Sequence, residues 1–164
     1  MLSNINDNQS SDIENLPITN SYYRTIVMIE RLHRLFLDDL KRELIRMRVY
    51  DINNVQCLLL YNIGDNEVNV GDLTHRGYYL GSNVSYNLRK LVENGYLSQK
   101  PSRNDRRQSD INLTQKGHEL SHKLHEFLRA QAETLSRDYS VGEQTLYDIE
   151  ESFKSIEKFL NGRN

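Results

Sequence analysis

The sequence predicts a mostly α-helical fold with one small β-hairpin, and three observations lead to this prediction. Apolar residues recur every three or four positions over long stretches on both sides of the chain's middle, as in amphipathic helices. Two strand-like segments, 96–100 and 110–114, flank a basic loop. A capped helix, 82–95, comes directly before the first of them. This order is typical of a winged helix-turn-helix, here with long additional helices.

Composition excludes several classes of protein. The chain has 164 residues, enough for one domain with a core, and is 37% hydrophobic and 27% charged. Its longest apolar run, 57–61, is far shorter than the ~18 residues of a membrane span, and no basic segment followed by an apolar one suggests a secretory signal. The single cysteine rules out an internal disulfide framework and fits a reducing compartment. We expect a cytoplasmic protein with no membrane partner.

The first third of the chain predicts a tail and one long helix. Residues 1–17 are rich in Asn, Asp, Gln and Ser, which is typical of a flexible tail. From Thr19 to Tyr50 the apolar positions cover more than one helix face, so this helix should contact more than one neighbour. His33 lies on the apolar side, where it is either a core or interface residue or a ligand-contacting, titrating one.

A second helix is expected from Asn54 to Ile63. Asp51 or Asn53 can cap its start, and Gly64 can end it. Cys57 lies within it with no basic residue near in sequence to lower its pKa, so we interpret this cysteine as structural rather than reactive.

The helix-turn-helix is expected to begin with a short β-like run, 67–70, that can pair with the hairpin, and a first helix, 70–77. Ser82 is a suitable N-cap for the second helix of this motif, 82–95, and Gly95 can end that helix in the left-handed conformation. Four apolar residues fall within one arc of this helix, as a core-facing stripe requires; they are Val84, Leu88, Leu91 and Val92.

The outer face of the predicted helix 82–95 is polar, carries two positive charges and has no acid. Asparagine can bond adenine edges, serine can reach several bases, and arginine can fork onto guanine. The same polar composition also occurs on an ordinary solvent-exposed helix face that binds nothing. The candidate DNA-contacting residues on this helix are Ser82, Asn83, Ser85, Tyr86, Asn87, Arg89 and Lys90.

The hairpin tip favours the DNA interpretation over a solvated surface hairpin. Arg103, Arg106 and Arg107 gather there, and three arginines held together need an anionic partner such as a phosphate row or a narrow minor groove. Asp105 can support the tip by pairing with Arg107. Residues 76–116 hold eight Lys/Arg against three Asp/Glu, a net of +5, which leaves −7 for the remainder. This distribution is expected of a protein that orients on double-stranded DNA.

After the hairpin, Thr114 should cap a helix that continues to about Tyr139. His118, His122 and His125 recur along one side at a spacing that could bind a metal, but no cysteine or close carboxylate completes the ligand set. We therefore expect structural or solvated histidines and no metal. Ser140 followed by Glu143 reads as the capping box of a last helix.

The long helices carry more apolar surface than a winged core can cover, which indicates a homodimer. We assign 18–50 and 114–164 to a helical dimerisation region and 51–113 to the DNA-binding region. A twofold dimer would place two reading helices about one turn of DNA apart, so the expected target is an inverted repeat.

Two motifs resemble the MarR family of bacterial regulators: the run 105–107 followed by Thr-Gln-Lys-Gly at 114–117, and the run 81–88 with its exit at 95–97. The run 76–87 is similar to an alphaproteobacterial subgroup associated with control of L,D-transpeptidase genes, hence with cell-wall remodelling. The resemblance implies a homodimer whose DNA affinity changes when a small, often aromatic, effector binds beside the dimer helices. His33, Leu37 and Tyr61 are the candidate effector-binding residues.

No nucleophile elbow, phosphate loop, paired metal motif or spaced carboxylate pair occurs beyond chance, so we expect neither an enzyme nor a cofactor. The alternative to a DNA-binding regulator is a winged-helix protein-interaction module without DNA binding.

Overall fold

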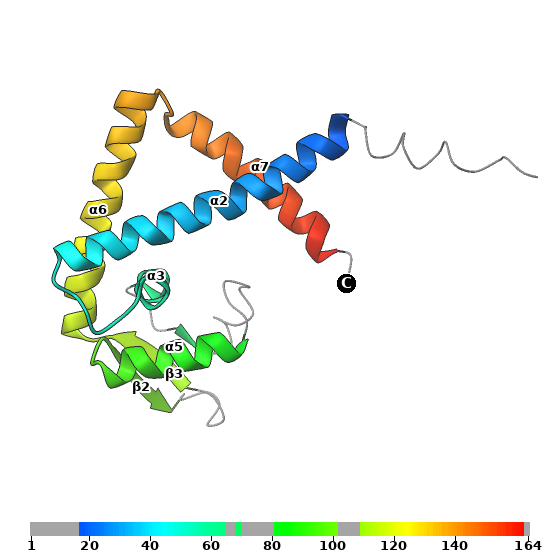
Figure 1. The fold of residues 1–164 in the computed structure, drawn as a ribbon. Helices are drawn as coiled ribbons and strands as arrows, with labels where there is room; N and C mark the ends of the chain where they lie inside the picture. The colour runs from blue at the N-terminus through cyan, green and yellow to red at the C-terminus, as the bar shows by residue number, and fades with distance from the viewer. Residues whose placement is uncertain (1–16, 65–67, 70–80, 102–108, 163–164) are drawn as a thin grey trace, which may run out of the picture. The chain divides into compact units, whose positions relative to one another are not determined.

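The structure is a computed structural model that describes residues 17–64, 68–69, 81–101 and 109–162 (Figure 1). The chain divides into two compact units, 1–58 and 59–164, and each is described by itself. The fold is mostly α-helical and belongs to the winged-helix class, as the sequence predicts. Over the described ranges it comprises five helices and a three-stranded sheet. None of these helices has an apolar stretch long enough to cross a bilayer.

Helix α2 runs from Pro17 to Arg46, so it ends four residues before the predicted Tyr50. The cause is a left-handed residue, Arg48, with φ of 59°. Behind it the Val49 amide donates to the Leu44 carbonyl oxygen at 2.9 Å, which closes the helix end as a Schellman motif. The predicted tail lies outside the described residues apart from Pro17, which begins α2.

Helix α3, Asn54–Ile63, has the predicted bounds, and Asn53 is its cap. The Gln56 amide donates to Asn53 Oδ1 at 2.8 Å, and the Asn53 amide donates to Gln56 Oε1 at 3.0 Å, a reciprocal capping box. Gly64 follows the helix with φ of +62°, a conformation that glycine adopts at little cost.

Helix α5 spans Gly81–Glu93. Ser82 therefore lies in its first turn and not at the cap, which corrects the predicted start by one residue. The exit is as predicted: Gly95 has φ of +77°, and the Tyr96 amide donates to the Leu91 carbonyl oxygen at 2.9 Å. The predicted first helix of the motif, 70–77, lies outside the described residues.

The sheet contains β1 (Val68–Asn69), β2 (Leu97–Pro101) and β3 (Ser109–Leu113) in the order β1-β3-β2. Both pairings are antiparallel, with Leu97 opposite Leu113 and Val68 opposite Ile111. The predicted pairing of the short run near 68 with the hairpin is thus confirmed. Helix α5 packs against β2 and α6 against β3, and Leu97, Ile111 and Leu113 are buried.

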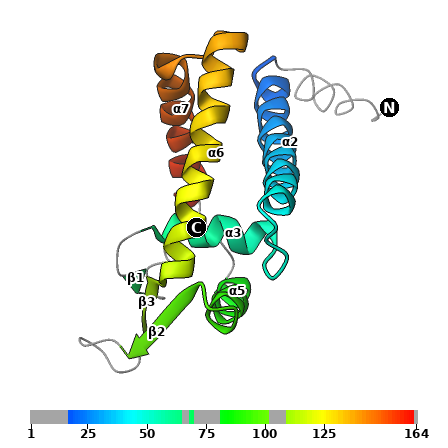
Figure 2. The same ribbon diagram turned by 90° about the vertical axis from the view of Figure 1, so that its left-hand side faces the viewer.

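Helix α6, Gln115–Tyr139, begins at the predicted Thr114 cap, and α7, Glu143–Asn161, runs back from its far end at an angle (Figures 1 and 2). The predicted capping box at Ser140 is wrong. Ser140 has φ of 57° and ends α6, with its amide donating to the Leu135 carbonyl oxygen. The N-cap of α7 is Gly142, which makes no side-chain capping bond.

Candidate nucleic-acid interface

The outward face of α5 is polar because the inward face is anchored in the core. Val84 and Leu91 have no exposed surface, and Leu88 is 4% exposed. The hydrophobic contact of these residues fixes the rotation of the helix about its axis. As predicted, the opposite side leaves four polar side chains exposed, and these are Asn83, Ser85, Tyr86 and Arg89.

Two residues of the predicted face differ from expectation. Asn87 is only 8% exposed, because its position on the helix borders the buried stripe, so its side chain is not presented to solvent. Lys90 is half-buried and donates to Glu93 Oε2 at 2.7 Å. This hydrogen bond raises the pKa of Lys90 and lowers that of Glu93. The sequence analysis did not predict this carboxylate beside the polar face of α5, although residues three positions apart on a helix, such as Lys90 and Glu93, commonly form ion pairs.

The wing residues Arg103, Asp105, Arg106 and Arg107 lie outside the described residues, as does the side chain of Ser82. The hairpin that carries the wing is described up to the pair Pro101–Ser109.

The exit of α5 is bonded to the start of α6 by a set of contacts that we call the junction, formed by residues 94–96 and 114–117. The Thr114 hydroxyl donates to the Gly95 carbonyl oxygen at 2.7 Å, and the Thr114 amide donates to the Tyr96 carbonyl oxygen at 3.0 Å. Lys116 Nζ donates to the Asn94 carbonyl oxygen at 2.9 Å and lies 3.9 Å from the centre of the Tyr96 ring, a cation–π contact. The junction therefore connects the outward-facing helix to α6.

Gly117 completes the junction because a side chain does not fit there. A Cβ on this residue would overlap the Tyr96 carbonyl oxygen and lie 2.9 Å from Leu113 Cδ2. The run Thr114 to Gly117, noted above only as a family motif, thus has a local physical explanation. Thr114 caps α6, Lys116 reaches back to α5, and Gly117 permits the close approach of the two backbones.

Cys57 has no exposed surface, and burial raises the pKa of its thiol to about 12. The thiolate is the reactive form of cysteine. In the folded protein the thiol keeps its proton through neutral and mildly alkaline pH, in line with a structural role.

We accordingly expect Cys57 to react slowly with Ellman's reagent (a thiol-specific dye) in the native protein and rapidly after denaturation. The reaction can be followed by absorbance at neutral pH. Fast labelling of the native protein would show that the thiol is accessible and would contradict the structural interpretation.

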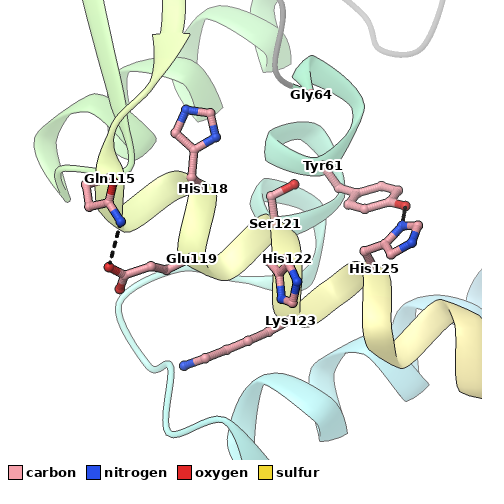
Figure 3. A pocket seen from close by; sticks show the side chains of 9 residues that line it. All are labelled: Tyr61, Gly64, Gln115, His118, Glu119, Ser121, His122, Lys123 and His125. Carbon is pink, nitrogen blue, oxygen red and sulfur yellow. Dashed lines mark hydrogen bonds between the residues drawn. The ribbon is translucent and has the colours of Figure 1, made fainter.

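A cavity of about 940 Å³ lies between the end of α3 and the first half of α6. The three histidines noted in the sequence line this cavity (Figure 3), and Tyr61 Oη lies 3.4 Å from His125 Nδ1. His118, His122 and His125 point in different directions, and no group of three potential ligands able to hold a metal occurs among the described residues. Of the candidate effector residues, Tyr61 lines this cavity, whereas His33 and Leu37 lie on α2 in the other compact unit and are exposed and half-buried respectively.

A helix with an exposed polar face, followed by a paired hairpin, is the arrangement of a winged-helix protein. Comparison with known proteins identifies the family. The profile of the MarR family matches residues 50–108. The exopolysaccharide II synthesis transcriptional activator ExpG of Rhizobium meliloti (strain 1021) is 34% identical over 138 residues, which cover 84% of this chain and 69% of ExpG. The chain belongs to the MarR family of transcriptional regulators, not to a family of enzymes.

Solved structures share the fold at lower identity. Streptococcus pneumoniae FabT, in complex with DNA, has a TM-score of 0.67 and 20% identity, covering 87% of this chain and 99% of FabT. Staphylococcus aureus MarR, in complex with salicylate and kanamycin, has a TM-score of 0.69 and 19% identity, covering 90% of this chain and 95% of that protein.

Proposed function

We propose that this protein is a homodimeric, cytoplasmic transcription regulator that reads an inverted repeat in double-stranded DNA. The observation that carries the proposal is the exposed polar face of α5, held outward by fully buried apolar residues and placed beside the hairpin. Asn83 and Arg89 supply groups that can bond base edges in a major groove. In this proposal the arginines at 103, 106 and 107 contact phosphates or a minor groove, supported by Asp105.

The homodimer is supported by helices that stay uncovered in a single chain. Helix α7 has no buried residue along its whole length, although it is amphipathic. Helix α2 likewise leaves large apolar side chains exposed, among them Tyr23, Leu32 and Leu35. Exposed apolar surface of this extent marks an interaction site. We propose that 18–50 and 114–164 form the dimerisation region and that 51–113 form the DNA-binding region.

We also propose that a small effector tunes the DNA affinity. S. aureus MarR, with the same fold, has been solved with salicylate and kanamycin, and this chain has a cavity of suitable size beside Tyr61. The similarity of the run 76–87 to regulators of L,D-transpeptidase genes supports cell-wall remodelling genes as the targets. The relative ExpG, an activator of exopolysaccharide synthesis, suggests a wider range of targets at the cell surface.

Fluorescence anisotropy with the protein's own upstream DNA and a scrambled duplex, over a range of salt, tests this function. We expect tight, sequence-selective binding with a steep loss of affinity as salt rises, because phosphate contacts release counterions. Equal, weak binding to several candidate upstream duplexes and to the scrambled one would instead favour the protein-interaction module.

Two sets of variants should separate reading from phosphate contact. Arg89→Ala or Asn83→Ala should cost about 1–3 kcal/mol on the preferred sequence and relax the sequence preference. Arg106→Ala with Arg107→Ala should weaken binding to every sequence and lower the salt slope by about two. The same anisotropy titrations measure both effects, and identical, sequence-blind losses in the two sets would contradict this division of roles.

A further inference from the structure

Tyr86 is the one large hydrophobic side chain that is exposed among the described residues of α5. Its exposed fraction is 51%, whereas Val84, Leu88 and Leu91 on the opposite side of the helix are buried. The exposed residues on either side of it are polar, and these are Asn83, Ser85 and Arg89. An aromatic ring therefore lies within an otherwise polar surface, the one proposed to face DNA.

The position of Tyr86 on the helix faces almost directly away from the core. At about 100° per residue, it lies within about 15° of the direction opposite to the mean direction of the three buried residues. Asn83 and Arg89 lie about 60° to either side of it. Tyr86 is therefore at the middle of the exposed face, where a helix in a major groove meets base edges rather than the phosphates that border the groove.

An aromatic ring at this position has one apolar partner in a major groove, the C5-methyl group of thymine. The other groups that base pairs present there are hydrogen-bond donors and acceptors, which lose free energy when a ring carbon covers them. Contact with the methyl group instead removes apolar surface of both partners from water. The ring therefore favours a 5-methylated pyrimidine, which in unmodified DNA is thymine.

We propose that Tyr86 is a specificity-determining residue that recognises a thymine by contact between its ring and the C5-methyl group. This role rests on the proposed function and names one base of the target sequence. Long side chains on a helix lean toward its N-terminus, so the ring leans toward Asn83, one turn earlier. Three residues of helix span about 4.5 Å and successive base pairs about 3.4 Å. The thymine therefore lies within about two base pairs of the base that Asn83 contacts.

Replacing thymine with deoxyuridine tests this contact, because the change removes the methyl group and keeps every hydrogen-bonding group of the base pair. The duplex is the protein's own upstream DNA, synthesised without 5-methylcytosine, so that any methyl effect comes from thymine. Substituting the thymines one at a time locates the contacted position. There, fluorescence anisotropy should show that a single deoxyuridine weakens binding about fourfold, the effect of losing one buried methyl group.

Variants of Tyr86 show whether its ring senses the methyl group. Tyr86→Phe keeps the ring and should keep the fourfold difference between thymine and deoxyuridine, whereas Tyr86→Ala should bind the two duplexes equally. Asn83→Ala is the matched control on the same face, and it should bind more weakly overall yet keep the difference. Circular dichroism verifies folding of each variant. A difference that persists in Tyr86→Ala, or one that is lost in Tyr86→Phe, would overturn the ring contact.

A scrambled duplex separates the failure of this contact from the failure of the proposed function. Selective binding of the upstream DNA with no response to deoxyuridine at any position would overturn the thymine contact and leave the regulator function intact. Equal, weak binding of the upstream and scrambled duplexes would count against the proposed function, and the role of Tyr86 would fall with it.

Discussion

Replacing Gly117 with alanine is expected to lower the free energy of unfolding by about 3 kcal/mol, the upper part of the range for overpacked interiors. Alanine in place of glycine inside an ordinary helix has the opposite effect and stabilises by up to about 1 kcal/mol. Here the added Cβ would overlap the Tyr96 carbonyl oxygen, which is backbone and already accepts from the Thr114 amide. It cannot move without breaking the junction. Chemical denaturation followed by circular dichroism measures the change.

Gly142→Ala is the matched control, because nothing lies within 4 Å of a Cβ at Gly142. Its φ of −87° suits any residue, so the loss should stay below about 1 kcal/mol, within the range for changes at a helix N-cap. If Gly117→Ala is as stable as the unaltered protein, the close approach of the two backbones is not required.

We further expect Gly117→Ala to bind DNA weakly even at temperatures where it remains folded, since the junction positions α5.

Introducing two acidic residues on the apolar face of α7, Ile149→Glu with Phe153→Glu, is expected to convert the proposed dimer to a monomer. Ile149 is 42% and Phe153 is 38% exposed in the single chain, although both are large and apolar. A dimer interface would bury them, and buried unpaired charges are costly. Sedimentation measures the assembly state. Affinity for the proposed inverted repeat should fall about 10²- to 10⁴-fold, because the two DNA-binding regions of the proposed dimer would no longer be linked.

Gln144→Glu with Ser155→Glu adds the same charge to the polar face of α7 and should leave the dimer and its DNA affinity nearly unchanged. A dimer that survives the Ile149 and Phe153 changes would exclude this face from the interface. An unaltered protein that sediments as a monomer at all concentrations would contradict the homodimer itself.

The sequence predicted those parts of the fold that depend on local chemistry. The cap at Asn53, one of two predicted candidates, the left-handed exit at Gly95 and the cap at Thr114 each follow from one residue type with a strong backbone preference. The errors came where two local signals compete. Ser140 can cap the following helix or end the preceding one, and its left-handed backbone selects the second role. Arg48 ended α2 early in a conformation that arginine seldom adopts.

The candidate site was predictable only along single elements. The buried stripe of α5 follows from helical periodicity, whereas the position of Asn87 at the edge of that stripe depends on neighbours that periodicity does not reveal. The junction joins residues about twenty positions apart through backbone carbonyl oxygens, and no side-chain pattern encodes these. The contact between Tyr61 and His125 spans 64 positions and requires the folded chain.

The ion pair between Lys90 and Glu93 gives the proposed reading helix an internal counterion. If Lys90 contacts a phosphate, as proposed, it gives up the carboxylate of Glu93 and displaces a cation from the DNA. Rising salt weakens the phosphate contact, but it also screens the exposed ion pair that has to be broken. Part of the salt effect therefore cancels. The number of phosphate contacts deduced from the salt dependence of binding would then be smaller than the number in the complex. In Glu93→Gln the deduced number should rise, because Lys90 no longer has a carboxylate to give up.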